Sequence, residues 1–126
     1  MTNPSEFRFS DSHEWFKTDG DTITLGITQF AANELTDITY VEMQPVGTSI
    51  VKNESVGEVE SVKTTSDVMS PFDGEIVEIN ESVVDNPSLL NSDPFGNGWL
   101  AKIRVEDTSD CDCLMDQSTY DSKYPV

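Results

Sequence analysis

The chain has few basic residues. Only 7 lysines and arginines stand against 24 aspartates and glutamates, so its 126 residues carry a net charge of −17. A surface with this charge repels nucleic acid and anionic membranes, and no basic cluster offsets it, which argues against both kinds of partner. The excess of acidic residues favours solubility. It also favours brief, electrostatically steered encounters with basic surfaces on other proteins.

Cysteine and histidine are also scarce. Cys111 and Cys113 are one residue apart, so a disulfide between them would close a small strained ring. No histidine or further cysteine lies near them to complete a tetrahedral zinc site, and we interpret them as reduced thiols without a metal. His13 is the only histidine, and it lacks a neighbouring thiol, serine–acid pair or metal cluster, which favours a structural role.

Long hydrophobic runs are absent, and no run approaches the roughly 20 apolar residues of a membrane span. The segment 1–10 has neither the apolar core of a secretory signal nor the arginine-rich pattern of a transit peptide. We therefore expect a cytoplasmic bacterial protein, or a mitochondrial matrix protein if a transit peptide has been trimmed. The length predicts a single domain over 1–126, with a core over about 7–105 and an acidic helical tail over 106–126.

The first third of the chain predicts short strands and one helix. One or two strands are expected over 6–17, and an Asp-Gly turn leads from them into an alternating strand over 22–27. Thr28 is a candidate N-cap for a helix that ends by 36–37. The inner face of that helix is expected to carry Phe30, Ala31 and Leu35.

Further strands are expected after this helix. In the strand over 38–43, strict alternation would place Ile38, Tyr40 and Glu42 on one face. Loops are expected over 82–98, a helical turn included, and the last strand over 99–105. The tail predicts a short helix that begins after Ser109, and its buried side would consist of Leu114, Met115 and Tyr120. Trp15 and Trp99 are interpreted as core residues.

A lysine between two predicted strands is the most informative feature. Val56, Val59 and Val62 precede Lys63, and a second apolar run follows it, whereas the segment 63–67 is short and polar. This pattern predicts a β-hairpin with its tip at 63–67. An exposed lysine at a defined tip is unsuited to acting as a catalytic base but is well placed for covalent modification.

The segments on either side of this lysine resemble each other weakly. Gly47 is followed by Asn53-Glu54-Ser55 at the same offsets at which Gly74 is followed by Asn80-Glu81-Ser82. The repeat would place the lysine turn between two similar half-units. We expect turn geometry to explain both glycines.

The lysine motif resembles the lipoylation site of the glycine cleavage system H-protein family. The motif has the order Glu60-Ser61-Val62-Lys63, Ser66-Asp67, Ser70-Pro71 and Gly74-Glu75. Further family landmarks follow in the same order and spacing: Ser12-His13-Glu14-Trp15, Leu25-Gly26-Ile27-Thr28, Thr39-Tyr40-Val41-Glu42, Asn91-Ser92-Asp93-Pro94-Phe95 and Gly98-Trp99. The resemblance covers about residues 7–120. It implies an all-β barrel-sandwich hybrid of two antiparallel sheets with short helices and a C-terminal helix.

The resemblance implies a non-catalytic carrier with lipoic acid attached covalently to Lys63. Its lipoyl arm would take the aminomethyl group of glycine from the decarboxylase to the aminomethyltransferase, and dihydrolipoyl dehydrogenase would then reoxidise it. Glu60 would be the acidic residue that the lipoate-attaching enzyme reads. Ser12, Glu14 and Asp67 match positions that line a cleft for the loaded arm. A monomer is expected, and no metal ligands or catalytic residues are implied.

Three alternatives stay open at this point. Biotin is disfavoured because Val62 and Thr64 flank the lysine, where a biotin site typically has methionines. An H-like lipoyl carrier for lipoate relay or sulfur metabolism is the nearer alternative. A hydrolase or lyase would need Glu14, Asp67 and His13 to converge in a pocket, and the sequence offers no nucleophile.

The sequence also departs from the family pattern. Phe30 replaces a common histidine, and Thr36 replaces the glycine that usually ends the helix. Met43-Gln44-Pro45 replaces the usual Leu-Pro followed by an acidic or polar residue.

Overall fold

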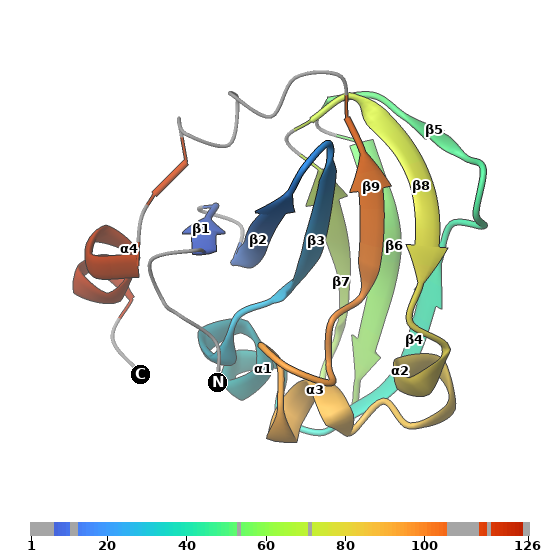
Figure 1. Ribbon diagram of the computed structural model, residues 1–126. Coiled ribbons are helices and arrows are strands. Elements are labelled where there is room, and N and C mark those ends of the chain that lie inside the picture. The colour runs from blue at the N-terminus through green and yellow to red at the C-terminus, as the bar shows by residue number, and fades with distance from the viewer. Residues whose placement is uncertain are drawn as a thin grey trace.

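The protein is a barrel-sandwich hybrid built from two antiparallel sheets (Figure 1). The computed structural model describes residues 7–10, 13–52, 54–70, 72–105, 114–115 and 117–124. One sheet has the strand order β1 (Phe7–Phe9), β2 (Glu14–Asp19), β3 (Thr22–Ile27), β9 (Ala101–Arg104), β8 (Gly74–Ile79) and β5 (Ser49–Ile50). The other has the order β4 (Ile38–Met43), β6 (Glu54–Ser61) and β7 (Thr65–Ser70). The predicted fold class is confirmed.

Four short helices accompany the sheets: α1 (Gln29–Leu35), α2 (Glu81–Asp85), α3 (Leu89–Ser92) and α4 (Gln117–Lys123). Figure 1 shows α1, α2 and α3 at one end of the sheets and α4 beside β1. Since β6 ends and β7 begins at the helical end, the β6–β7 turn lies close to α1 (Figure 1). In the part of the chain that the structure describes, no helix has the length and apolar character needed to cross a membrane.

The start of α1 is as predicted, but its buried face is shifted by one residue. The Thr28 hydroxyl accepts a hydrogen bond from the Ala31 amide at 3.2 Å and so caps the helix. Ala32 and Leu35 are the buried residues, whereas Phe30 and Ala31 are only half-buried. Leu35 is buried as predicted and Ala31 packs against the core from its edge, whereas Phe30 packs against the smaller aromatic cluster and the buried Ala32 was not predicted.

Strand β4 does not alternate as predicted. Its pairing with β6 shifts between Ile38 and Tyr40, which is the signature of a β-bulge. The irregularity turns both Ile38 and Val41 into the core, while Tyr40 is 45% exposed. Ile38 and Tyr40 consequently do not share a face.

Other boundaries also differ from the predictions. The last strand spans Ala101–Arg104 rather than 99–105, and 82–98 contains α3 and most of α2 instead of loops with one helical turn. β7 already begins at Thr65, so the hairpin tip consists of Val62, Lys63 and Thr64 rather than residues 63–67. Helix α4 begins at Gln117, after Met115 has paired with Phe9 in an isolated β-bridge. Of the residues predicted to line that helix, only Tyr120 lies in it. Cys111 and Cys113 lie outside the described residues.

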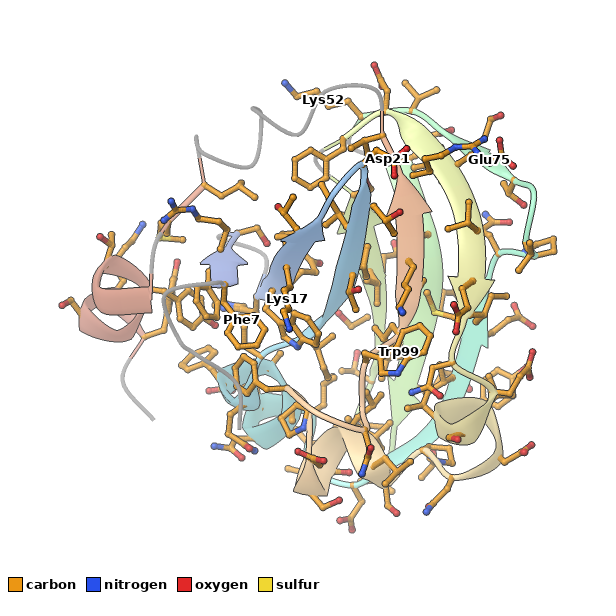
Figure 2. All side chains as sticks on the ribbon, viewed as in Figure 1. Phe7, Lys17, Asp21, Lys52, Glu75 and Trp99 are labelled. Carbon is orange, nitrogen blue, oxygen red and sulfur yellow. The ribbon has the colours of Figure 1, made fainter. Side chains whose placement is uncertain are left out.

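The buried side chains form two clusters. The larger cluster fills the space between the sheets and contains Phe16, which meets Phe72 edge-on with 5.4 Å between the ring centroids. The smaller cluster is aromatic and consists of Phe7, Phe9, Trp15 and Tyr120. It packs α4 against β1, and in Figure 2 Phe7 lies on that side of the molecule. Trp15 is 2% exposed, as expected of a core residue, whereas Trp99 is only half-buried at the edge of the smaller cluster.

The two weakly similar segments meet in the structure. Ser49 pairs with Glu75 and Ile50 with Gly74, so the start of one segment lies against the start of the other. Gly47 has a φ of 94°, which fits the expected turn. Gly74 instead lies within β8, where a Cβ would come 2.5 Å from a methyl group of Ile103 and 2.6 Å from the Arg104 carbonyl. Close strand packing, not a turn, therefore requires glycine at 74.

Candidate functional site

Lys63 is exposed in the middle of the hairpin tip, between β6 and β7. The tip contains none of the residues that usually form turns, because its members are Val62, Lys63 and Thr64. The turn is closed by a backbone hydrogen bond of 2.8 Å from the Ser61 amide to the Thr64 carbonyl. The Ser61 hydroxyl accepts from the amides of Lys63 (3.1 Å) and Thr64 (3.2 Å) and lies 3.3 Å from the Thr64 carbonyl.

The tip rests against the junction between α1 and β4. The Val62 amide donates to the Asp37 carbonyl at 3.1 Å. Asn91 of α3 fixes this junction, because its side chain accepts from the Ile38 amide at 3.1 Å and donates to the Thr36 carbonyl. The hairpin thus presents its lysine from a braced turn.

The amine of Lys63 lies at the C-terminal end of α1. Nζ donates to the Glu34 carbonyl at 3.1 Å, where the partial negative charge of a helix end attracts an ammonium group. Both groups are exposed, so this single hydrogen bond holds the amine only weakly. A primary amine in this setting is open to acylation, and the site therefore fits a prosthetic group attached through an amide bond.

Glu60 lies on β6, three residues before the lysine. It pairs across the strands with Tyr40 on one side and Thr65 on the other, and it is half-buried. The Thr65 hydroxyl donates to its carboxylate at 3.5 Å, at the limit of a hydrogen bond. Glu60 thus lies close to the tip in sequence and is not fully buried.

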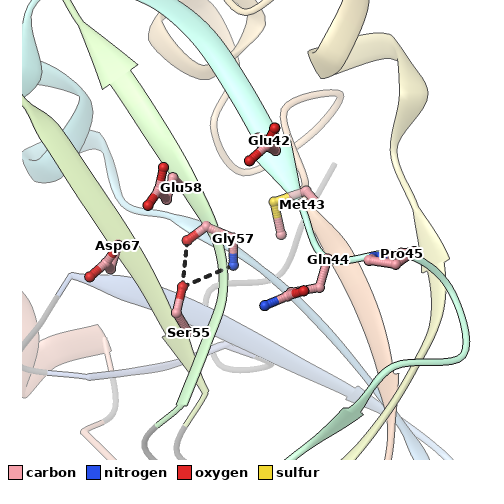
Figure 3. Close-up of a pocket in the computed structure, with 8 residues that line it drawn as sticks. All are labelled: Glu42, Met43, Gln44, Pro45, Ser55, Gly57, Glu58 and Asp67. Carbon is pink, nitrogen blue, oxygen red and sulfur yellow. Dashed lines mark hydrogen bonds between the residues drawn. The ribbon is translucent and has the colours of Figure 1, made fainter.

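Asp67 belongs to an exposed acidic face of the three-stranded sheet, which we define by Glu42, Glu58, Glu60 and Asp67. Glu42 pairs with Glu58, and Glu58 pairs with Asp67, so three carboxylates form a row across β4, β6 and β7. Beside this row lies an open depression of about 510 Å³ (Figure 3). Met43, Gln44, Pro45, Ser55 and Gly57 complete its lining.

The acidic face acts electrostatically on Tyr40. The Tyr40 hydroxyl donates to Glu42 at 3.1 Å. This hydrogen bond raises the pKa of Tyr40 above its ordinary value of 10.0, and the charges of Glu42, Glu60 and Glu58 raise it further. The phenol stays neutral and remains a hydrogen-bond donor on this face.

Glu14 is the one carboxylate of the predicted cleft that is buried, with 1% exposure. It accepts from the Ser10 hydroxyl at 2.6 Å and from the Met69 amide at 3.2 Å. Met69 is two residues beyond Asp67 in β7, so Glu14 contacts the strand that carries Asp67. Asp67 itself is exposed on the acidic face, and Ser12 lies outside the described residues.

His13 and Glu14 do not line the depression beside the acidic face, to which Asp67 belongs. Its Nδ1 is 2.9 Å from the Tyr120 hydroxyl, which is 2.7 Å from the hydroxyl of the helix cap Thr28. The imidazole also packs against Phe30 and Tyr124, with ring centroids 4.6 Å and 4.5 Å away. His13 thereby ties α4 to the start of α1.

Sequence reasoning missed the residues that brace the tip. The carbonyls of Glu34 and Asp37 are backbone groups, so no side-chain pattern could point to them. Ser61 and Asn91 were present in the motifs, but a serine before a lysine and an asparagine in a loop have many uses. Only the fold shows that these residues act on the same turn.

The family model described as glycine cleavage H-protein matches residues 7–125. The chain belongs to the glycine cleavage H-protein family. The glycine cleavage system H protein of Geobacillus thermodenitrificans is 46% identical over 120 residues, which cover 95% of this chain and 94% of that protein.

A plant relative and a solved structure extend the similarity. The mitochondrial glycine cleavage system H protein 2 of Arabidopsis thaliana is 44% identical over 115 residues, or 91% of this chain and 74% of the relative. The crystal structure of the H protein from Mycobacterium marinum superposes with a TM-score of 0.84 at 34% identity. That alignment covers 98% of this chain and the whole of the other.

Three departures from the H-protein pattern now have structural counterparts. Phe30, in place of the common histidine, packs against His13 and Tyr124. Thr36 ends α1 with a φ of 63° and a ψ of −132°, a conformation that suits glycine and strains a β-branched residue. The segment 43–45 lines the depression beside the acidic face.

Proposed function

We propose that this protein is the lipoyl carrier of a glycine cleavage system and that Lys63 is its attachment residue. The observation that carries the proposal is the exposed amine of Lys63 at a braced hairpin tip, in a chain of the H-protein family. The carrier role needs no catalytic group of its own. The accessible tip and the family membership together favour it over a hydrolase or lyase.

Attachment depends on the amine of Lys63. After the amine leaves the Glu34 carbonyl and loses a proton to solvent, its lone pair attacks the carboxyl carbon of a lipoyl adenylate. An amide bond forms as the bond to AMP breaks, and AMP departs with the electron pair. Glu60 is proposed as the acidic residue that the attaching enzyme reads, because its carboxylate lies near the tip and remains accessible.

When bound, a lipoyl group supplies a strained disulfide that opens to two thiols, one of which can carry an aminomethyl group. The chain contributes the tether. A tether of this kind raises the local concentration of the sulfur atoms at each partner's active site without tight binding. The proposed partners are glycine decarboxylase, the aminomethyltransferase, dihydrolipoyl dehydrogenase and the lipoate-attaching enzyme.

For the loaded arm we propose docking near Ser12, Glu14 and Asp67. An aminomethyl thioether carries a cationic ammonium at neutral pH, which a carboxylate can hold. Asp67 is exposed, whereas Glu14 can receive the arm only if its hydrogen bonds to Ser10 and Met69 rearrange. Asp67→Asn should therefore hasten spontaneous breakdown of the loaded form, and Glu14→Gln should do so only to the extent that this rearrangement occurs.

The function is tested by reconstitution with a glycine decarboxylase. Lipoylated wild-type protein should support exchange of carbon between bicarbonate and the carboxyl group of glycine, and Lys63→Arg protein should not. Absence of exchange with a fully lipoylated protein would contradict the glycine cleavage role. It would instead favour an H-like carrier that serves lipoate relay or another pathway.

A further inference from the structure

The structure assigns a positioning role to Ser61: its hydroxyl sets the turn that presents Lys63 to the lipoate-attaching enzyme. This inference rests on the proposed function, because it concerns the attachment reaction at the same lysine. It adds a residue to that site for which the motif itself gives no role.

The hairpin tip lacks the residues that usually form a turn. Val62, Lys63 and Thr64 include no glycine, proline, asparagine or aspartate, and none of the three has a positive φ. Val62 and Thr64 are β-branched and favour extended strand conformations over a turn. Their sequence alone would not hold a three-residue reversal in one conformation.

Ser61 supplies the missing constraint from within the hairpin. One hydroxyl accepts from two successive amides, those of Lys63 and Thr64, and also reaches the Thr64 carbonyl. This is how a serine side chain substitutes for backbone groups in a turn. It orients the Lys63 backbone, and therefore the direction in which the side chain leaves the tip.

The second support for the tip comes from outside the hairpin and does not fix Lys63 itself. The Val62 amide is held by the Asp37 carbonyl, and among the described residues the Lys63 amine contacts the exposed Glu34 carbonyl alone. The amine must leave that contact to react. During attachment the Ser61 hydroxyl then holds the Lys63 amide itself, while the backbone bonds of Ser61 to Thr64 and of Val62 to Asp37 hold only the residues on either side. Loss of the hydroxyl should leave the fold intact and the tip poorly ordered.

The experiment compares Ser61→Ala, Ser61→Thr and Ser49→Ala in the full chain. Threonine keeps the hydroxyl, and Ser49 is an exposed serine of β5, outside the lysine motif, whose hydroxyl has no hydrogen bond among those seen in the described residues. Initial rates of attachment are measured by intact mass with a lipoate ligase, ATP and lipoic acid. Amide hydrogen exchange at residues 63 and 64 is measured by NMR on the unmodified proteins.

If the turn is populated only part of the time, the apparent KM for the carrier rises while kcat stays nearly constant. We expect Ser61→Ala to raise KM about tenfold, the factor given by about 1.4 kcal/mol. Amide exchange at 63 and 64 should accelerate in the same variant. Ser61→Thr should stay within about twofold of wild type because it keeps the hydrogen bonds, and Ser49→Ala should do so because it removes none.

Three results would overturn the inference. An unchanged KM in Ser61→Ala would show that the enzyme shapes the tip by itself, and a fall in kcat alone would indicate direct contact with the reaction. Equal effects of Ser61→Ala and Ser61→Thr would point to the side-chain volume instead of the hydroxyl. A wild-type protein that is not lipoylated at all would contradict the proposed function. The role of Ser61 in the turn is tested separately, and unaltered amide exchange at residues 63 and 64 in Ser61→Ala would refute it.

Discussion

The carboxylate of Glu14 accepts a hydrogen bond from the backbone amide of Met69 at 3.2 Å. Glu14 begins β2 in the six-stranded sheet, and Met69 lies in β7, at the edge of the three-stranded sheet. A buried side chain of one sheet thus satisfies a backbone donor at the edge of the other. The contact joins the two sheets at β7, the strand that also carries Asp67.

Glu14→Ala should therefore destabilise the fold. The substitution leaves the Met69 amide and the Ser10 hydroxyl without their carboxylate, and an unsatisfied buried donor costs about 1–3 kcal/mol. We expect the free energy of unfolding, measured by urea denaturation, to fall by about 2 kcal/mol. Glu14→Gln retains one acceptor oxygen and should lose less. A loss below about 0.5 kcal/mol in Glu14→Ala would contradict a bracing role for this contact.

Thr36→Gly should stabilise the protein, although most substitutions do the opposite. Thr36 has a φ of 63° and a ψ of −132°, and backbone strain of this kind costs about 1–3 kcal/mol. Glycine relieves the strain but loses about 0.5–1 kcal/mol through its greater freedom in the unfolded chain. The expected net gain is about 1 kcal/mol by urea denaturation.

Thr39→Gly is the matched control for Thr36→Gly. Thr39 is an exposed threonine in β4, and it is not among the described residues with a positive φ. Its replacement should destabilise the protein, as glycine does in strands. A loss of stability in both variants would show that Thr36 is not strained.

The pKa of Tyr40 reports on the acidic face. The hydrogen bond to Glu42 holds it above 10.0, so Tyr40 contributes stability below pH 10 and loses that contribution as the pH rises through its folded-state pKa. Glu42→Gln should lower the pKa, measured by NMR titration of the Tyr40 ring. Glu75→Gln removes an equal charge from the other sheet and should leave the pKa nearly unchanged. A Tyr40 pKa that does not respond to Glu42→Gln would contradict the assigned cause.

The row Glu42–Glu58–Asp67 should cost stability, because like charges directly opposite each other on paired strands repel. Glu58→Gln is expected to raise the free energy of unfolding by about 0.3 kcal/mol at low salt. The gain should vanish near 1 M salt, where the screening length is about 3 Å. Glu75→Gln breaks an ion pair with Arg104 and should change stability in the opposite direction. No gain in Glu58→Gln at low salt would mean that the side chains diverge enough to avoid one another.

The strands and the helix cap were predictable because local chemistry determines them. The alternation over 22–27 favours a strand wherever one face of that strand is buried. The hydroxyl of Thr28 favours a helix start wherever the next residues are helical. The bulge in β4 was not predictable, since it arises when packing between the sheets draws Ile38 and Val41 inward together. The strand preferences of the individual residues do not reveal which side chains such packing turns toward the core.

The candidate site likewise has features that the sequence predicts and features that it does not. The polar segment after Val62 indicated a hairpin and an exposed lysine, and both are present. The burial of Glu14 was not predictable from the residues next to it in the sequence, because its partner Met69 is 55 residues away. The brace at Asp37 and Asn91 likewise depends on contacts between distant segments.

The most direct test of the central claim is the intact mass of the protein after co-expression with a lipoate ligase. Wild-type protein should gain one lipoyl group, and Lys63→Arg should gain none. Lys52→Arg is the matched control, because Lys52 is also exposed in a loop but lies at the end of the sheets away from α1 (Figure 2). It should be modified as fully as wild type. A lipoyl group that persists in Lys63→Arg, or that is lost in Lys52→Arg, would contradict the assignment of Lys63.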